Sequence, residues 1–250
     1  MSGHSHWATI RRKKGAMDAK RGKIFTRLAR EIVVAAREGG GDPNTNLRLQ
    51  YAIDKARAEN MPKDSIERAI KRGTGESKDG GELVELTYEG YAPHGIAVMI
   101  SCVTDNKNRT VSEIRHVLSR AGGSMGEGGS VAWQFKRSAY FSFPSEGQDP
   151  DDVFMIAIEG GADDVNFDEE TIEIIGPVEA FKQISDELKN AGIKSEEAEL
   201  RYLPKNETEL SVDQTIQVMK VLDALEELDD VQDVYSTLSI SDEAMMELAA

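Results

Sequence analysis

Positively charged side chains near the amino terminus are the residues of this sequence with the clearest chemical meaning. Four of them are consecutive, from Arg11 to Lys14, in a segment with few apolar residues. Others recur at helical spacing, at Lys20, Lys23, Arg27, Arg30 and Arg37. In an α-helix these five side chains fall within one arc about 100° wide. Lysine and arginine in such an arrangement neutralise the phosphates of a nucleic-acid backbone.

Rings that can stack on bases accompany these cations. Trp7, with His4 or His6, precedes the first basic run, and such rings are stacking platforms for unpaired bases. We therefore predict a nucleic-acid-binding site that contains His4, Trp7, Arg11, Arg12, Lys13, Lys14, Lys20, Arg21, Lys23, Arg27 and Arg30. The alternative is that the cations only form a solvated helix face. No membrane partner is predicted, because Trp and Phe do not line the outer face of this helix.

The net charge of −15 is distributed very unevenly along the chain. Residues 1–80 hold 18 Lys/Arg against 10 Asp/Glu, residues 81–137 hold 6 against 6, and residues 138–250 hold 6 against 29, giving +8, 0 and −23. The first third is thus a basic module on an acidic body. The acidic part either keeps the protein soluble or docks a basic partner protein.

The helices that would carry the cations follow from the apolar pattern of residues 1–80. Between about residues 20 and 38, apolar side chains repeat on the face opposite to the cations, at Ile24, Leu28, Ile32 and Ala35. Asp42 and Pro43 have the residue types of a second helix start. A third helix follows Pro62 and ends at Gly73. The sequence therefore predicts a three-helix domain over residues 1–80.

The remainder of the chain mixes strands with helices. Residues 84–89 alternate like a half-buried strand, residues 96–103 are apolar like a strand covered on both faces, and residues 111–118 have helical spacing. Residues 131–135 alternate again and predict a further strand. From residue 139 to residue 203 the pattern reads strand, helix, two strands, helix and strand, which is the ferredoxin-like order.

A helix over residues 212–228, with Ser211 and Gln214 as its capping box, and a strand over residues 231–240 are predicted to return to the first sheet. The predicted fold class is therefore α+β and multidomain, with an N-terminal three-helix domain followed by two α+β domains. One of these comprises residues 81–137 plus 205–250, and the other is a ferredoxin-like domain, residues 138–204, inserted in it.

Other chemical patterns are better explained by structure than by catalysis or ligand binding. The glycine-rich segment 122–129 matches no phosphate-binding motif and carries Glu127, so we interpret it as a connection between a helix and a strand. Asp164, Asn166 and Asp168 lack the glycine and the closing glutamate of a calcium loop. The single cysteine, Cys102, lies in an apolar run and excludes an intrachain disulfide. No catalytic residue, metal or cofactor is predicted.

One enzymatic alternative stays open. His94, Asp105 and Arg109 follow or precede predicted strands and could converge as the active site of a hydrolase or transferase. The competing interpretation is that they serve turns and a helix cap.

A cytoplasmic location is expected. The longest apolar run, Gly95–Val103, is much shorter than the roughly 20 residues of a membrane-spanning helix. The basic start is not followed by the apolar region of a secretory signal.

Several segments together resemble the YebC family. They are Gly3-His4-Ser5, Trp7-Ala8, Ile10 and residues 18–26, then 60–73, 88–95, 104–110 and 122–135. The resemblance is dense over residues 1–137. His6 and Arg11-Arg12 stand where the family pattern has a Lys and a Lys-His pair, which preserves most of the charge but not the histidine.

The resemblance implies a three-domain protein without catalytic residues. Bacterial members are described as probable transcriptional regulators that bind DNA, and others act on translation, where they help ribosomes through consecutive prolines. The leading hypothesis is a non-enzymatic regulator of gene expression that binds nucleic acid through its basic module. The alternatives are a ribosome-associated factor that binds ribosomal RNA and an adaptor that binds proteins through its acidic domains.

Overall fold

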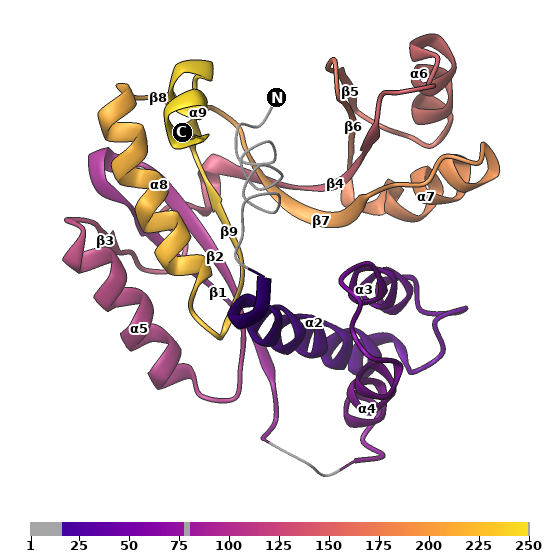
Figure 1. The fold of residues 1–250 in the computed structure, drawn as a ribbon, viewed down its shortest axis with the longest axis horizontal. Coiled ribbons are helices and arrows are strands. Elements are labelled where there is room, and N and C mark those ends of the chain that lie inside the picture. Colours follow the sequence, from indigo (N-terminus) through magenta and orange to yellow (C-terminus); the bar gives the residue numbers. More distant parts are fainter. Residues whose placement is uncertain (1–16, 78–80, 250) are drawn as a thin grey trace. The chain divides into compact units, whose positions relative to one another are not determined.

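The computed structural model describes residues 17–77 and 81–249, with side chains from residue 22 onward except those of residues 242 and 249. Residues 135–205 form one compact unit. The other described residues form a second unit, which contains the helical module and the sheet that follows it. The fold class predicted from the sequence is confirmed, because three helices are followed by two α+β arrangements and the chain returns to the first of them (Figure 1).

The helical module consists of three helices, α2 (Met17–Gly39), α3 (Leu47–Ala58) and α4 (Lys63–Gly73). The predicted start of the second helix at Asp42 is wrong. The Asp42 carboxylate instead accepts from the backbone N–H of Asn44 at 2.9 Å within a turn. Asn46 caps α3 by accepting from the N–H of Leu49, and its side-chain amide donates to the Ala35 carbonyl at 2.7 Å. The buried Asn46 therefore fixes where α3 begins and how it joins α2.

The core of the helical module extends into the first sheet. Ile32, Ala35 and Leu49 are fully buried in it, and Leu83 and Val103 belong to the same apolar cluster. Helix α4 approaches α2 so closely that a Cβ on Gly73 would lie 2.5 Å from the backbone oxygen of Val33. The helical module is thus packed against the chain segment that follows it.

The first sheet is antiparallel with strand order β3-β1-β2-β9. Its strands are β1 (Val84–Tyr91), β2 (Ala97–Thr104), β3 (Ser124–Met125) and β9 (Val231–Ser236). Helices α5 (Lys107–Arg120) and α8 (Val212–Glu226) lie side by side against one face of this sheet (Figure 1). Ile100 and Cys102 of β2 are buried against these helices, whereas Val103 contacts the helical module. The apolar run predicted to be covered on both faces is therefore confirmed.

The carboxyl-terminal segment differs from its prediction in detail. Its strand is interrupted after Ser236, and the separate β10 (Leu238–Ser239) pairs in parallel with β8 (Thr208–Glu209). A final helix, α9 (Asp242–Ala249), was not predicted. The capping box at Ser211 and Gln214 is confirmed at the start of α8.

Residues 135–205 have the predicted ferredoxin-like topology, with antiparallel strand order β5-β6-β4-β7. The elements in chain order are β4 (Phe135–Pro144), α6 (Pro150–Glu159), β5 (Asp164–Phe167), β6 (Thr171–Gly176), α7 (Phe181–Asn190) and β7 (Glu197–Pro204), and short 3₁₀ turns lie along the chain at Pro93–Gly95, Ala132–Gln134 and Val178–Ala180. Phe141, Ile174 and Ile184 are fully buried in the core of this unit. Alternate strand residues and one stripe of each helix supply this core, which is why the periodicity of the sequence revealed it.

Candidate nucleic-acid interface and the Asp230 cluster

The basic face of α2 contacts the carboxyl end of α8. Lys23 Nζ donates to the Glu227 carbonyl at 3.1 Å and forms an ion pair of 3.4 Å with the Glu227 carboxylate. One turn later, Arg27 Nη2 donates to the Glu226 carbonyl at 2.7 Å. The last carbonyls of a helix have no partner within the helix and carry partial negative charge, so cations are stabilised there.

Arg30 continues this contact into the loop between α8 and β9. Its guanidinium donates to the carbonyl of Asp229 and forms an ion pair of 2.9 Å with the carboxylate of Asp230. The sequence predicted that Lys23, Arg27 and Arg30 would form a free cationic face. In the structure all three bind carbonyls or carboxylates of the same chain, a competing use of these cations that the sequence did not indicate.

Asp230 is the centre of a buried polar cluster that no sequence pattern indicated. The Asp230 cluster comprises Asp230 and the four side chains that bind it, from Arg30, Thr104, Arg109 and Thr110. Arg109 Nη2 lies 2.8 and 2.7 Å from the two carboxylate oxygens, and the threonine hydroxyls donate at 3.0 and 2.8 Å. The side chain of Asp230 is only 1% exposed. The cluster therefore ties the helical module, α5 and the α8–β9 loop together.

The electrostatics of the cluster favour the ionised carboxylate. Burial would raise the pKa of Asp230, but hydrogen bonds from Arg109, Thr110 and Thr104, together with the charge of Arg30, lower it below its usual value. A cleft of about 340 Å³ beside the cluster is lined by Lys23, Arg30, Asp105, Arg109, Glu113, Glu227, Leu228, Asp229 and Asp230. Carboxylates outnumber cations in this lining, so the cleft does not favour a phosphate.

The remaining predicted site residues lie at or before the start of α2. His4, Trp7, Arg11, Arg12, Lys13 and Lys14 lie outside the described residues. Lys20 and Arg21 belong to α2, but their side chains also lie outside the described part. The nucleic-acid site predicted for these eight residues therefore stays a prediction.

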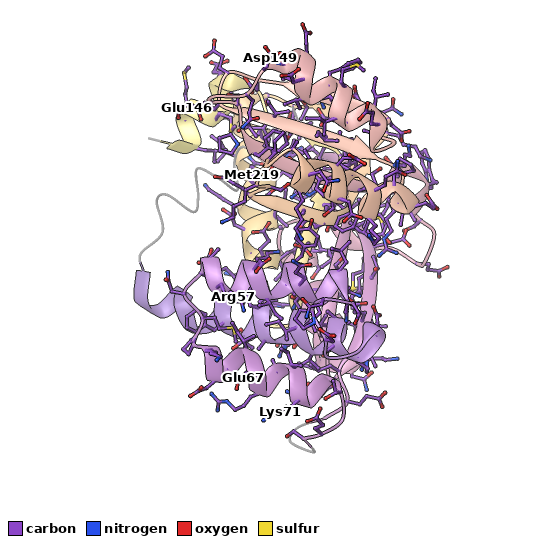
Figure 2. The ribbon with its side chains drawn as sticks, turned by 90° about the vertical axis from the view of Figure 1, so that its right-hand side faces the viewer. Arg57, Glu67, Lys71, Glu146, Asp149 and Met219 are labelled. Carbon is purple, nitrogen blue, oxygen red and sulfur yellow. The ribbon has the colours of Figure 1, made fainter. Side chains whose placement is uncertain are left out.

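Elsewhere on the helical module, several cations are paired with carboxylates. Lys55 lies 3.7 Å from Glu31, and Lys63 lies 3.6 Å from Glu67. Figure 2 labels Arg57, Glu67 and Lys71 on this module, where both signs of charge occur. A surface of mixed charge has little net attraction for phosphates.

The glycine-rich segment is held by an internal carboxylate. The two oxygens of Glu89 accept from the backbone N–H groups of Gly129, Val131 and Ala132 at 2.7, 2.7 and 2.8 Å. These amides resemble an anion-binding nest that the chain fills itself. Because they bind Glu89, residues 131 and 132 do not continue a strand, and the strand predicted over residues 131–135 is wrong. The structure has a 3₁₀ turn there, and β4 begins at Phe135.

We expect Glu89→Gln to destabilise the protein by about 1 kcal/mol at neutral pH, because only one amide oxygen remains to accept. Burial would raise the pKa of Glu89, but the N–H donors lower it. Because the pKa of Glu89 is lowered by folding, its hydrogen bonds stabilise the protein fully above about pH 4.3, the pKa of an unfolded glutamate. This stabilisation is lost as the pH falls through the pKa of Glu89 in the folded protein.

Urea unfolding of wild type and variant, followed by tryptophan fluorescence, measures this difference as the pH is lowered. The exposed Glu127 of the same loop provides the control, since Glu127→Gln should change stability by less than about 0.5 kcal/mol. A difference between wild type and Glu89→Gln that persisted unchanged in acid would contradict the assignment.

The hypothetical active site at His94, Asp105 and Arg109 is not assembled. His94 Nε2 lies 2.9 Å from the Gln217 amide oxygen, in the turn before β2. Asp105 and Arg109 form an ion pair of 3.0 Å after the opposite end of β2. The interpretation of these residues as structural therefore explains their contacts.

The structure also bears on a reactive thiol, a metal site and a membrane-spanning helix. Burial and the nearby charges of Asp230 and Asp233 raise the pKa of Cys102 to about 12, so its thiol stays protonated. Among residues 17–77 and 81–249, no three His, Cys, Asp or Glu side chains gather closely enough to hold a metal ion. Within the same ranges, no helix combines the length and apolar character that crossing a membrane requires.

Comparison with known proteins covers nearly the whole chain. The family models described as the TACO1/YebC protein N-terminal domain and the TACO1/YebC second and third domain match residues 5–76 and 83–238. A protein of Petrotoga mobilis is 50% identical over 100% of this chain and 99% of its own length, and one of Geotalea uraniireducens is 51% identical over 98% of each. Both are named probable transcriptional regulatory protein.

A solved structure is also similar. The crystal structure of the conserved hypothetical protein Aq1575 from Aquifex aeolicus has a TM-score of 0.82 and 42% sequence identity, and the match covers 91% of this chain and 93% of that one.

Proposed function

Since the chain belongs to the TACO1/YebC family, we propose that it is a non-enzymatic, cytoplasmic regulator of gene expression that binds nucleic acid through its amino-terminal cations. The proposed phosphate-binding residues are Arg11, Arg12, Lys13, Lys14, Lys20 and Arg21, with His4 and Trp7 as stacking groups. The names of the relatives support a regulatory role in transcription, and DNA is therefore the first ligand to test.

The observation that carries this proposal is the position of the unbalanced charge. Residues 1–21 contain six Lys/Arg and only one acidic residue, Asp18. The cations that follow, Lys23, Arg27 and Arg30, are bound to the end of α8. By sequence, residues 1–21 therefore carry a net charge of +5 out of the +8 of residues 1–80, and they include the amino end of α2, which is the positive end of the helix dipole.

We assign a positioning role to Lys23, Arg27 and Arg30. By fixing α2 against the α8–β9 loop, they hold the amino end of the helix in a defined orientation to the first sheet. Pre-orientation of a charged segment reduces the conformational entropy lost when it binds.

Salt dependence of binding tests this function. If about six phosphates are neutralised, the logarithm of the affinity for duplex DNA should fall against the logarithm of salt concentration with a slope near −5, and near −4 for single-stranded RNA. A mobility-shift titration with each nucleic acid over a series of salt concentrations measures both slopes. Tighter binding to DNA would support the transcriptional role. The proposal fails if neither nucleic acid binds, or if the affinity does not respond to salt.

A further inference from the structure

Helix α6 of the ferredoxin-like unit exposes large apolar side chains. Phe154, Met155 and Ile158 are 46%, 56% and 51% exposed. The opposite side of the same helix already supplies the core, with Val153 and Ala157 at 1% and 0% exposure. This helix is therefore apolar on two sides, although only one of them is covered.

The exposed apolar side chains form one stripe rather than scattered positions. At about 100° per residue, Phe154 and Ile158 lie on the same helix face and Met155 lies beside them, so that all three fall within an arc of roughly 100°. We call Phe154, Met155 and Ile158 the α6 stripe. Clustered exposed apolar groups with polar surroundings are typical of protein interaction sites.

Carboxylates lie within the α6 stripe and along one side of it. Asp151, Asp152 and Glu159 are exposed on the same helix. Asp149 caps the start of α6, where Figure 2 labels it, and Glu146 precedes it by three residues in the sequence. Over residues 135–205 there are 17 Asp/Glu against 7 Lys/Arg, a net charge of −10. An approaching cationic molecule is attracted over this whole unit.

We propose that the α6 stripe docks a basic protein segment whose apolar side chains alternate with lysines and arginines. Apolar contact with the stripe would supply affinity, and the neighbouring carboxylates would select and orient the cationic partner. A nucleic acid is excluded by repulsion between phosphates and carboxylates, and a second copy of this unit would bring two charges of −10 together. The inference is independent of nucleic-acid binding by the amino terminus.

A defined probe tests the surface directly. We would titrate the full chain with a synthetic peptide of about 14 leucines and lysines, patterned as an amphipathic helix, and follow binding by fluorescence anisotropy and by amide NMR shifts. Binding is expected to shift the amides of α6. The same peptide with serine in place of leucine should bind at least about tenfold more weakly, and the one with glutamate in place of lysine should not bind.

Paired substitutions locate the binding surface. Phe154→Gln combined with Ile158→Gln should weaken binding of the leucine–lysine peptide by at least about tenfold, and Asp151→Asn with Glu159→Gln should weaken it and reduce its salt dependence. Glutamine is a good helix former and these side chains are exposed, so the helix should persist. Circular dichroism verifies this.

Helix α9 provides the matched control, because it also carries an exposed methionine between exposed glutamates. Met246→Gln, and separately Glu243→Gln with Glu247→Gln, should leave peptide affinity unchanged. The proposal is overturned if folded α6 variants bind the peptide as wild type does, or if α9 variants lose the same affinity. It is also overturned if the NMR shifts map elsewhere, or if sedimentation shows that the free chain dimerises through the α6 stripe.

Discussion

Replacing Asp230 with alanine should lower the free energy of unfolding by about 3–5 kcal/mol, since it removes the carboxylate partner of Arg30, whose side chain is only 16% exposed. Arg109 would keep its ion pair with Asp105 but lose the Asp230 carboxylate, and the buried hydroxyls of Thr104 and Thr110 would lose the carboxylate they share. The cost exceeds that of an exposed ion pair, because Asp230 is 1% exposed. Urea denaturation followed by tryptophan fluorescence measures it, since Trp7 and Trp133 both lie outside residues 135–205.

The neighbouring residue supplies the control for this experiment. Asp229 is exposed and offers Arg30 only its backbone carbonyl, so Asp229→Ala should change stability by less than about 0.5 kcal/mol. Because the pKa of Asp230 is lowered, its contribution is complete above the unfolded value and fades as the pH falls through the folded one. Equal destabilisation of the two variants would show that the loop, and not the carboxylate, is responsible.

The parts of this structure that sequence could predict are those with a repeating apolar pattern. The ferredoxin-like order was readable because Val153, Ala157, Ile184 and Leu188 mark the inner faces of its two helices. Strands 84–91 and 97–104 were readable for the same reason, since burial follows side-chain alternation or continuous apolar character. Even the return of the last strand to the first sheet followed from the order of the elements.

The contacts of the basic helix could not be read in this way. A cationic arc opposite an apolar stripe has the same sequence whether it faces phosphates or the end of another helix. Arg27 and Arg30 donate to the backbone carbonyls of Glu226 and Asp229. Every residue type has such a carbonyl, so these acceptors cannot be recognised from the sequence. Asp230 itself lies in a segment with 29 acidic residues, where nothing in its spacing distinguishes it.

Side-chain hydrogen bonds also explain why two local predictions, a strand and a helix start, were wrong. Residues 131–135 alternate like a strand, but the Glu89 carboxylate, more than 40 positions earlier, binds the first of these amides. Asn46 similarly replaced Asp42 as the cap of α3 because its amide also reaches Ala35. In both cases a side chain also binds a backbone group distant in sequence, Val131 for Glu89 and Ala35 for Asn46, and no local propensity encodes such a contact.

The contacts of Lys23, Arg27 and Arg30 with the end of α8 and with Asp230 divide the amino-terminal cations into two classes. Substitutions in the two classes should have different effects. Changing Arg11, Arg12, Lys13 and Lys14 together to glutamine should reduce nucleic-acid affinity about a thousandfold near 0.1 M salt. On duplex DNA the salt slope should become less steep by about 0.9 for each phosphate that the variant no longer neutralises. Stability should stay unchanged, since these residues precede the described core. Mobility-shift titrations and urea denaturation of the same preparation measure both quantities.

The second class should show the opposite behaviour. Changing Lys23, Arg27 and Arg30 together to glutamine removes the bonds to the α8 end and to Asp230, so it should destabilise the protein by about 2 kcal/mol. The salt slope of nucleic-acid binding should remain near −5, because the same phosphates are still neutralised. A slope that became less steep by about 3 units in this variant would mean that these side chains leave α8 and bind phosphates. The contact between α2 and α8 would then be a closed state that nucleic acid opens, and the two classes would merge into one binding face.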